Sequence, residues 1–263
     1  MKIGKKDNQP QSAKASLSGR FGGAKAMIFS AGLGTRLKPI TDNLPKALVP
    51  IAGKTLLEHT LTKLISSGFN EIIVNVHHFP DMIIDFLKEK NNFGIRIEVS
   101  DERDMLLETG GGIRKASWFF DDGKPFLIHN VDILSNVDLA DLYQRHLKSD
   151  SLATLIVSPR DTFRHLLFDR ENRLQGWINE KTGETKPPAL TDIPVYQKLA
   201  FSGIQVLSPA VFEQMADFPE KFSIIDFYLQ NAQSHKITGY TPENFRMFDV
   251  GKIETLEQAV KFV

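Results

Sequence analysis

The chain of 263 residues contains no cysteine. This absence excludes disulfide bonds, thiol nucleophiles and metal sites with cysteine ligands. A net charge is also missing, because 32 Lys and Arg residues are balanced by 32 Asp and Glu residues. A neutral chain has no general attraction for nucleic acid or for an anionic membrane surface, so we expect neither as a partner. Any anionic ligand must therefore be bound by a local group of cations.

Long hydrophobic runs are missing as well. The longest, such as residues 26–29, are far too short to span a bilayer. The chain begins Met-Lys-Ile-Gly-Lys-Lys and continues polar, without the apolar segment of a secretory signal. We therefore expect a cytoplasmic protein. Residues 1–23 are rich in Lys, Gln, Ser and Gly, which predicts a mobile N-terminal tail, and we expect residues 24–263 to form a single domain.

From Lys25 onward, short apolar segments alternate with segments whose apolar residues have helical spacing. Strands are predicted at residues 26–30, 71–76, 95–99, 125–129 and 152–157, and helices at 55–67, 80–90, 111–119 and 138–147. Such alternation is typical of βαβ units, in which helices cover both faces of a parallel sheet. We therefore predict an α/β fold, a Rossmann-like α/β/α arrangement of three layers with a mostly parallel sheet.

The alternation weakens after residue 157. Strands at residues 165–168, 173–178 and 200–207 are predicted without helices between them, and residues 183–197 are predicted to form a long loop because three prolines lie there. Helices follow at 209–215, 224–233 and 253–263, with a strand at 236–240. No hexapeptide repeat follows the core. The second part of the domain is thus expected to differ in architecture from the first.

A glycine-rich segment, Ala-Gly-Leu-Gly-Thr-Arg at residues 31–36, directly follows the first predicted strand. Open α/β sheets bind ligands at the carboxyl ends of their strands, and glycines let backbone N–H groups approach a phosphate closely. Arg36 adds a bidentate cation. A dinucleotide-binding loop would need a third glycine at Leu37, and no Gly-Lys-Ser or Gly-Lys-Thr closes the segment as in a P-loop. Taken alone, the segment is also compatible with a plain tight turn.

A second motif follows at residues 41–50. Together the two segments have the pattern Gly-x-Gly-Thr-Arg-Leu-x-Pro-x-Thr, then Pro-Lys-x-Leu-x-Pro. This pattern resembles the signature of the sugar-1-phosphate nucleotidyltransferase superfamily at every defining position. The resemblance extends from Lys25 to near the C-terminus. It implies an enzyme that joins a nucleoside triphosphate to a sugar 1-phosphate and releases pyrophosphate, and it is greatest for N-acetylmuramate-1-phosphate uridylyltransferases and mannose- or heptose-1-phosphate guanylyltransferases.

The resemblance implies roles for the cations. Arg36 would neutralise the β- and γ-phosphates, and Lys46 would bridge the α-phosphate and the incoming sugar phosphate, which agrees with the physical need to hold two anions together. Arg36, Lys46 and Asp132 would be the catalytic residues. Nucleotide binding is implied for Ala31, Gly32, Gly34, Thr35, Glu108, Thr109 and Gly111. The three glycines at 110–112 suggest a flat backbone surface for the base, although a flexible helix N-terminus is an equal alternative.

Magnesium is the implied cofactor, with Asp132 and Asp249 as its ligands. Asp132 follows a predicted buried strand, and magnesium often takes one or two carboxylates besides phosphate and water oxygens. Val131 stands where the family usually has glycine, and it would crowd the turn if that turn needed a positive φ. Sugar binding is implied for Asn179, Glu180, Ser202 and Gly203. We therefore expect a nucleotide-binding part at 24–157 and a sugar-binding part at 158–263.

Several alternatives stay open at this point. The expected reaction uses UTP or GTP, and neither the base nor the sugar is decided by the motifs. The chain is expected to be a monomer or a small homo-oligomer. A catalytically inactive subunit that senses nucleotide sugars and a cytidylyltransferase acting on an amino-alcohol phosphate are the rival functions. Among the histidines, His129 is expected to have a structural role, although it is close enough to Asp132 in sequence to border the site.

Overall fold

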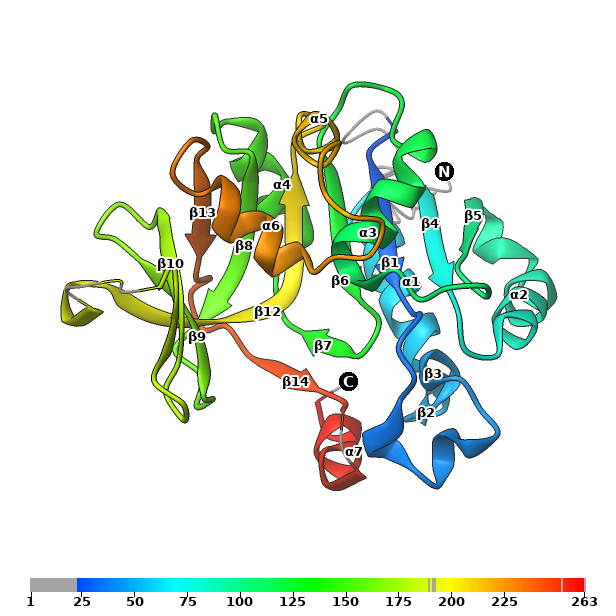
Figure 1. Cartoon of the computed structure of the whole chain (residues 1–263). Helices are drawn as coiled ribbons and strands as arrows, with labels where there is room; N and C mark the ends of the chain where they lie inside the picture. Colours follow the sequence, from blue (N-terminus) through cyan, green and yellow to red (C-terminus); the bar gives the residue numbers. More distant parts are fainter. Residues whose placement is uncertain (1–22, 189, 191–192, 252, 263) are drawn as a thin grey trace, which may run out of the picture.

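The structure is a computed structural model that describes residues 23–188, 190, 193–251 and 253–262. The predicted N-terminal tail, residues 1–23, lies outside the described residues apart from its last position. Within the described range, the chain folds around one large twisted sheet with helices on both of its faces (Figure 1).

Four parallel strands form one side of this sheet. They are β1 (Lys25–Phe29), β4 (Glu71–Val76), β5 (Arg96–Asp101) and β6 (Phe126–Asn130), in the spatial order β6-β1-β4-β5. β1 pairs with both β4 and β6 in parallel register. All four strands end at the same edge of the sheet, which is the edge where α/β proteins bind their ligands.

Alternation of side chains along β1 produces two separate hydrophobic cores. Ala26 and Ile28 pack on one face with residues of α1 (Leu56–Ser66), α2 (Pro80–Glu89) and α4 (Leu139–Leu147). Met27 packs on the other face with residues of α3 (Glu108–Lys115), α5 (Val211–Gln214) and α6 (Ile224–Asn231). Because the side-chain period of a strand is two, one buried strand serves both cores. The three predicted layers are confirmed.

An antiparallel part extends the sheet beyond β6. The long strand β12 (Gln197–Leu207) pairs antiparallel with β6, with β8 (Ala153–Ser158) and with β9 (Arg164–Phe168). β9 pairs with β10 (Leu174–Asn179), which pairs with β11 (Glu184–Lys186), while β13 (Ile237–Tyr240) lies parallel to β8. The whole sheet is therefore mixed, with a parallel core.

The prediction of a loop over residues 183–197 is wrong in its first part. β11 forms a hairpin with β10 there, and it ends at Lys186, where Pro187 follows. Proline cannot donate a hydrogen bond to a neighbouring strand, so the proline pair limits the strand without preventing it. A short 3-10 turn occupies Ile193–Val195.

Two small two-stranded sheets were not predicted. β2 (Pro50–Ile51) pairs with β3 (Lys54–Thr55), and β7 (Ile133–Ser135) pairs with β14 (Met247–Asp249). Two or three residues are too few to show a periodic pattern. The second pairing brings the segment before α7 (Ile253–Val260) against the segment that follows β6. It is therefore important for the site, since it places Asp249 opposite Ile133.

Local signals explain where several helices begin. Thr55 caps α1 by accepting a hydrogen bond from the Glu58 N–H at 3.1 Å, and Asp138 caps α4 through the N–H groups of Ala140 and Asp141. α2 begins at Pro80, as predicted. Among the described helices, none combines the length and the apolar character that crossing a membrane requires.

Candidate functional site

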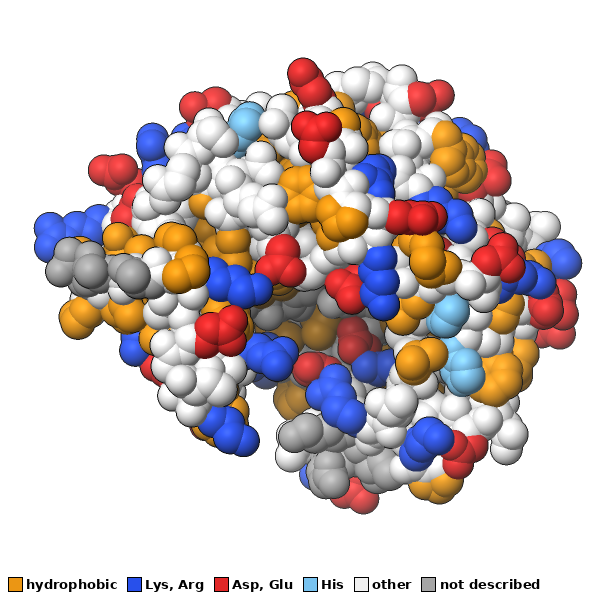
Figure 2. All heavy atoms as spheres, in the orientation of Figure 1, with side chains coloured by type: hydrophobic (Ala, Val, Ile, Leu, Met, Phe, Trp, Pro, Cys, Tyr) orange, Lys and Arg blue, Asp and Glu red, His pale blue; other side chains and the backbone are white. Residues whose placement is uncertain are grey.

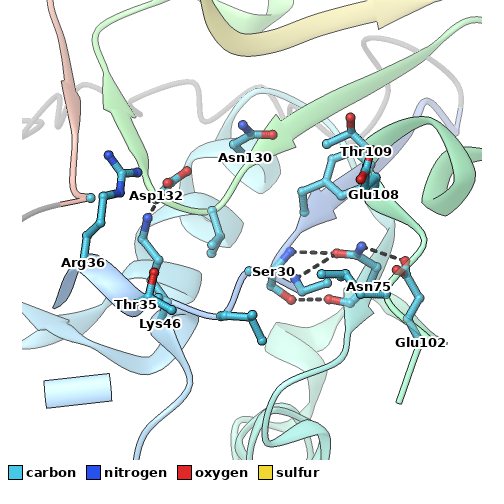
Figure 3. Close-up of a pocket in the computed structure, with 18 residues that line it drawn as sticks. Ser30, Thr35, Arg36, Lys46, Asn75, Glu102, Glu108, Thr109, Asn130 and Asp132 are labelled. Carbon is cyan, nitrogen blue, oxygen red and sulfur yellow. Dashed lines mark hydrogen bonds and ion pairs between the residues drawn. The ribbon is translucent and has the colours of Figure 1, made fainter. Parts of the chain in front are cut away.

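A pocket of about 450 Å³ lies where β1, β4 and β6 end. The face shown in Figure 2 is hollowed at its centre, and acidic and basic side chains gather around the hollow. Most residues that the motifs singled out line this pocket, and Figure 3 shows several of them as sticks. They are Ala31, Gly32, Gly34, Thr35, Arg36, Lys46, Glu108, Thr109 and Asp132.

The glycine-rich segment folds tightly against Thr41. Gly34 has a φ of 65°, and a Cβ at this position would lie 2.9 Å from the Thr41 methyl carbon. The Thr41 hydroxyl donates to the Gly34 carbonyl at 2.8 Å. A Cβ at Gly32 would meet nothing within 4 Å, so that glycine faces open space. The structure thus requires glycine at 34 for its own fold and leaves the backbone at 32 accessible to a ligand.

Lys46 and Asp132 form an ion pair inside the pocket. Lys46 lies in a short 3-10 turn (Lys46–Leu48) and is largely buried, and its ammonium donates a short hydrogen bond to the Asp132 carboxylate (Figure 3). Partial burial reduces the screening of such a pair by water. The pocket therefore holds a fixed positive charge and a fixed negative charge side by side.

Val131 causes no strain in the turn before Asp132. It is not among the described residues with positive φ, and its side chain is buried in the core. Its N–H donates to the Phe29 carbonyl at 3.0 Å, which continues the pairing of β6 with β1 past the strand end. The backbone here does not need the glycine that the family usually has.

Asp249 and Arg36 meet beside Asp132. The Val250 N–H donates to the Asp132 carbonyl at 2.8 Å, next to the β7–β14 pair. A Cβ at Gly251 would lie 2.7 Å from both the Arg36 guanidinium and the Asp249 Oδ1, so only glycine leaves room for both side chains. Arg36, Lys46, Asp132 and Asp249, predicted from separate motifs, are thus brought together.

Asp132 and Asp249 are the acidic residues implied as magnesium ligands. Within the described ranges, no group of three or more His, Asp or Glu side chains forms a ready-made metal centre. Magnesium needs fewer protein ligands than that, because water and phosphate oxygens complete its shell. Asp249 Oδ1 is buried without a hydrogen-bond partner in the part of the chain that the structure describes, and the neighbouring Asp132 carboxylate lines the pocket. The two carboxylates therefore fit magnesium.

A buried polar network supports the pocket, and the sequence reasoning missed it. The Asn75 side-chain oxygen accepts from the N–H groups of Ser30 (2.7 Å) and Ala31 (3.3 Å), and its amide donates to Glu102 at 2.8 Å (Figure 3). The second Glu102 oxygen accepts from the Leu107 N–H at 3.1 Å. The network joins the glycine-rich segment to the start of α3. Its one signal in the sequence was a polar Asn75 inside an apolar strand.

The segment around α3 carries the residues expected to contact the base. Glu108 lines the pocket and has a φ of 61°, which is uncommon for a residue with a side chain. Thr109 also lines the pocket, and its hydroxyl accepts from the Ile224 N–H at 3.0 Å. Gly111 is not part of the lining, since its N–H donates to the Phe222 carbonyl at 3.2 Å. The glycines at 110–112 lie inside α3, which begins earlier than predicted. Gly110 and Gly111 allow it to pack closely on residues 220–222, whereas Gly112 faces Glu102 and Phe29.

Two of the predicted sugar contacts lie on β12 and differ in orientation. Gly203 has a φ of 77°, and a Cβ there would lie 2.5 Å from the Asn130 amide nitrogen. Since Asn130 lines the pocket, Gly203 borders it. The Ser202 hydroxyl is buried and donates to the Ile156 carbonyl of the neighbouring strand at 2.8 Å, so it points into the sheet.

The other two predicted sugar contacts have partners of their own. The Asn179 side chain accepts from the Lys181 N–H at 3.1 Å and closes the turn after β10. Glu180 bonds the Lys198 ammonium at 2.7 Å, and its second oxygen lies 3.5 Å from the His165 Nδ1. The hydrogen bond from Lys198 lowers the pKa of the Glu180 carboxyl. Neither Asn179 nor Glu180 is among the described residues that line the pocket.

Comparison with known proteins identifies the family of the chain. The model of the family described as Nucleotidyl transferase matches residues 25–263. The chain is 31% identical, over 231 residues, to the N-acetylmuramate alpha-1-phosphate uridylyltransferase of Caulobacter vibrioides, covering 84% of this chain and 90% of the relative. It is 29% identical, over 193 residues, to the mannose-1-phosphate guanyltransferase of Yarrowia lipolytica, covering 72% of this chain and 50% of that relative.

A solved structure shares the fold. HddC from Yersinia pseudotuberculosis, crystallised as a complex with GMP-PN, superposes with a TM-score of 0.71 at 23% identity, over 90% of this chain and 98% of that one. The motifs, the mixed sheet with its parallel core and the family match all agree. The chain therefore belongs to the Nucleotidyl transferase family and is an enzyme of the sugar-1-phosphate nucleotidyltransferase superfamily.

Proposed function

We propose that the chain transfers a nucleoside monophosphate from UTP or GTP to a sugar 1-phosphate, giving a nucleotide-diphospho-sugar and pyrophosphate. One observation carries the proposal: Arg36, Lys46 and Asp132 line a pocket of about 450 Å³ that also has the glycine-rich segment in its wall, and Asp249 lies beside Gly251 of the same wall. Two relatives are named as a uridylyltransferase and a guanyltransferase, and these names support UTP and GTP as candidate substrates.

The reaction needs no protein nucleophile. An oxygen of the sugar phosphate is already ionised, so it attacks the α-phosphorus directly, a new P–O bond forms, and the bond to the leaving pyrophosphate breaks. The difficulty is repulsion between the two anions. The fixed positive charges of Arg36 and Lys46 at the pocket reduce that repulsion and stabilise the charge that develops during transfer.

Asp132 and Asp249 are proposed to hold magnesium, which would draw negative charge from the α-phosphate and the pyrophosphate. Lys46 forms an ion pair with Asp132. Glu108 and Thr109 are proposed to contact the nucleotide from α3, and the backbone of residues 31–35 is proposed to contact the phosphates. The Gly111 N–H donates to the Phe222 carbonyl, so we propose that Gly111 holds α3 in place and does not contact the nucleotide.

On the sugar side, Gly203 is proposed to keep the pocket open beside Asn130. Ser202 has its hydroxyl in the sheet, and Asn179 and Glu180 have partners of their own, so their contact with the sugar stays a prediction. The division into a nucleotide-binding part at 24–157 and a sugar-binding part at 158–263 is part of this proposal. The cytoplasmic location and the monomeric or small homo-oligomeric state stay predictions.

The test is an assay of pyrophosphate release. The protein is incubated with magnesium and each nucleoside triphosphate in turn, against a panel of sugar 1-phosphates. Release with UTP or GTP and one of these sugars is expected, and Asp132→Ala should remove most of it while circular dichroism stays unchanged. Release only with CTP and an amino-alcohol phosphate would favour the cytidylyltransferase, and binding of nucleotide sugars without any release would favour the inactive sensing subunit.

A further inference from the structure

A second cavity lies behind the segment that carries Asp132. It has a volume of about 280 Å³ and is enclosed by α1, by β6 and β7, and by Lys54 and Phe262. Among the described residues, none lines both this cavity and the pocket of the proposed reaction. The two spaces are therefore separate, and the residues that line the second cavity have no part in the proposed reaction.

Lys63 of α1 brings an unbalanced positive charge to this cavity. Its ammonium donates to the Ser135 carbonyl at 2.5 Å, and it forms no ion pair with the described residues. The charge of Asp138 stabilises the Lys63 ammonium, but the Asp138 carboxylate already accepts hydrogen bonds from the N–H groups of Ala140 and Asp141. Burial lowers the pKa of Lys63 to about 8, against the opposing effect of Asp138. A half-buried ammonium without a counter-ion is stabilised by binding an anion.

His129 supplies an unused hydrogen-bond acceptor to the same wall. It is fully buried, and burial lowers its pKa to about 4, so the ring is neutral at pH 7. Its Nδ1 lies 2.8 Å from the Asn130 carbonyl, which can only accept, so Nδ1 carries the proton and Nε2 is the acceptor. Nε2 has no partner among the described residues, and neither has the buried Ser135 hydroxyl. Buried polar groups are rarely left unpaired.

We propose that this cavity is a second binding site, for a small molecule that carries a phosphoryl group and at least one O–H. Lys63 binds the anionic oxygens, the Ser135 hydroxyl donates to a further oxygen, and His129 Nε2 accepts from the O–H. Hydrogen phosphate meets both conditions, because it has anionic oxygens and a proton of its own. A small phosphate monoester such as a sugar phosphate meets them as well.

The position of the cavity connects it to Asp132. The Thr60 hydroxyl, in the cavity wall, lies 3.4 Å from the Val131 carbonyl, and Ile133, also in the wall, pairs with Asp249. The wall of the cavity therefore adjoins the segments that carry the two proposed magnesium ligands, and this link to the reaction rests on the proposed function.

The binding test uses inorganic phosphate as the probe and the broadening of its ³¹P NMR signal as the readout, without other substrates. The Lys46→Met variant removes a cation from the reaction pocket, and Lys63→Met removes the half-buried cation of the second cavity and keeps an unbranched stem. Lys88→Met on exposed α2 is the control. Saturable binding is expected in Lys46→Met and Lys88→Met. It should weaken about tenfold in Lys63→Met, since a charged hydrogen bond is lost.

Two results would overturn the site. Binding that disappears in Lys46→Met and is unchanged in Lys63→Met belongs to the reaction pocket alone, and no saturable binding in any variant means that the cavity holds only water. If Lys63→Met does not fold by circular dichroism, Ser135→Ala takes its place, with an expected weakening of roughly threefold. Displacement of phosphate by glucose 6-phosphate would identify an ester as the preferred occupant, and lack of displacement would identify inorganic phosphate. Because this assay needs no turnover, its failure is distinguishable from failure of the proposed function.

Discussion

Two lysine–carboxylate ion pairs, one in each part of the sheet, have the same chemistry and different surroundings. Lys46 and Asp132 lie at the edge of the parallel part, where their side chains are 10% and 21% exposed. Lys198 and Glu180 lie on the antiparallel part, where both side chains are 39% exposed. The first pair lines one pocket together with Arg36, and Asp249 lies beside Gly251 of that pocket, whereas the second pair has one further partner, His165.

The difference comes from how the strands end. Parallel strands all finish at one edge, so the segments that follow β1, β4 and β6 deliver their polar residues to the same place. Antiparallel strands finish alternately at opposite edges, so the residues of β9, β10 and β12 find local partners instead. The comparison teaches that convergence of strand ends, more than the kind of residue, makes a reactive site here.

The largest effect is expected from Lys46→Met. It removes the cation proposed to lie between the two phosphates, so the rate of pyrophosphate release should fall by about 10³-fold, as for other lost groups that stabilise transferred charge. The measurement is kcat at saturating substrates, with circular dichroism to check the fold. A loss of thermal stability without a loss of kcat would place Lys46 among the structural residues and would remove the difference between the two pairs.

Asp249→Asn is expected to have the next largest effect. The amide keeps the shape of the side chain but loses the charge of the buried, unpartnered Oδ1. The rate should fall by about 10²-fold, and more magnesium should be needed for half-maximal rate, because magnesium prefers carboxylate oxygen. Asp85→Asn, on exposed α2, is the control and should leave the magnesium titration unchanged. Identical titrations for wild type and Asp249→Asn would remove Asp249 from the metal site.

Much of this parallel edge was predictable, because its motifs are contiguous. Gly34, Arg36 and Lys46 belong to segments that follow one strand, and the strand at 71–76 was predicted at its observed bounds. That Asp249 would lie beside Asp132 depends on β7 and β14, which are too short to show a pattern. The link between Asn75 and Glu102 could not be predicted for another reason, since it joins a side chain of β4 to one that follows β5.

The antiparallel part was less predictable. Its strands were located by their apolar alternation, but the partners of Asn179, Glu180 and Ser202 depend on which strands pair and in which register. Register follows from tertiary packing rather than from any local signal. For the same reason, the sequence did not predict β11, which lies between a polar turn and two prolines.

Glu102→Gln is expected to have a moderate effect. Glutamine presents an NH₂ group either to the Asn75 amide or to the Leu107 N–H, so one buried donor loses its acceptor. The KM for the nucleotide should rise by about tenfold and the Tm should fall by several degrees, as is usual for one unsatisfied buried group. Glu171→Gln, an exposed carboxylate of the antiparallel part, is the control and should change neither quantity.

Lys198→Met should have the smallest effect. An exposed ion pair contributes little, so the rate of pyrophosphate release and its KM for the sugar phosphate should each change by less than about threefold. The loss of Lys198 should also raise the pKa of the Glu180 carboxyl toward its ordinary value, which NMR titration can follow. A large rise in the KM for the sugar phosphate would bring this pair into the substrate site and would end the contrast with Lys46 and Asp132.

The hydrogen bond from Val250 to Asp132 has a consequence for the order of protein synthesis. Asp132 leaves the ribosome long before Val250 does. The Asp132 carbonyl can accept its hydrogen bond from the Val250 N–H only after Val250 has been translated. A nascent chain that has been translated only through α6 can assemble its parallel strands and still lacks Asp249, Gly251 and the β14 strand that holds them against β7. The proposed metal site is therefore expected to be complete only after residues 247–251 have been translated.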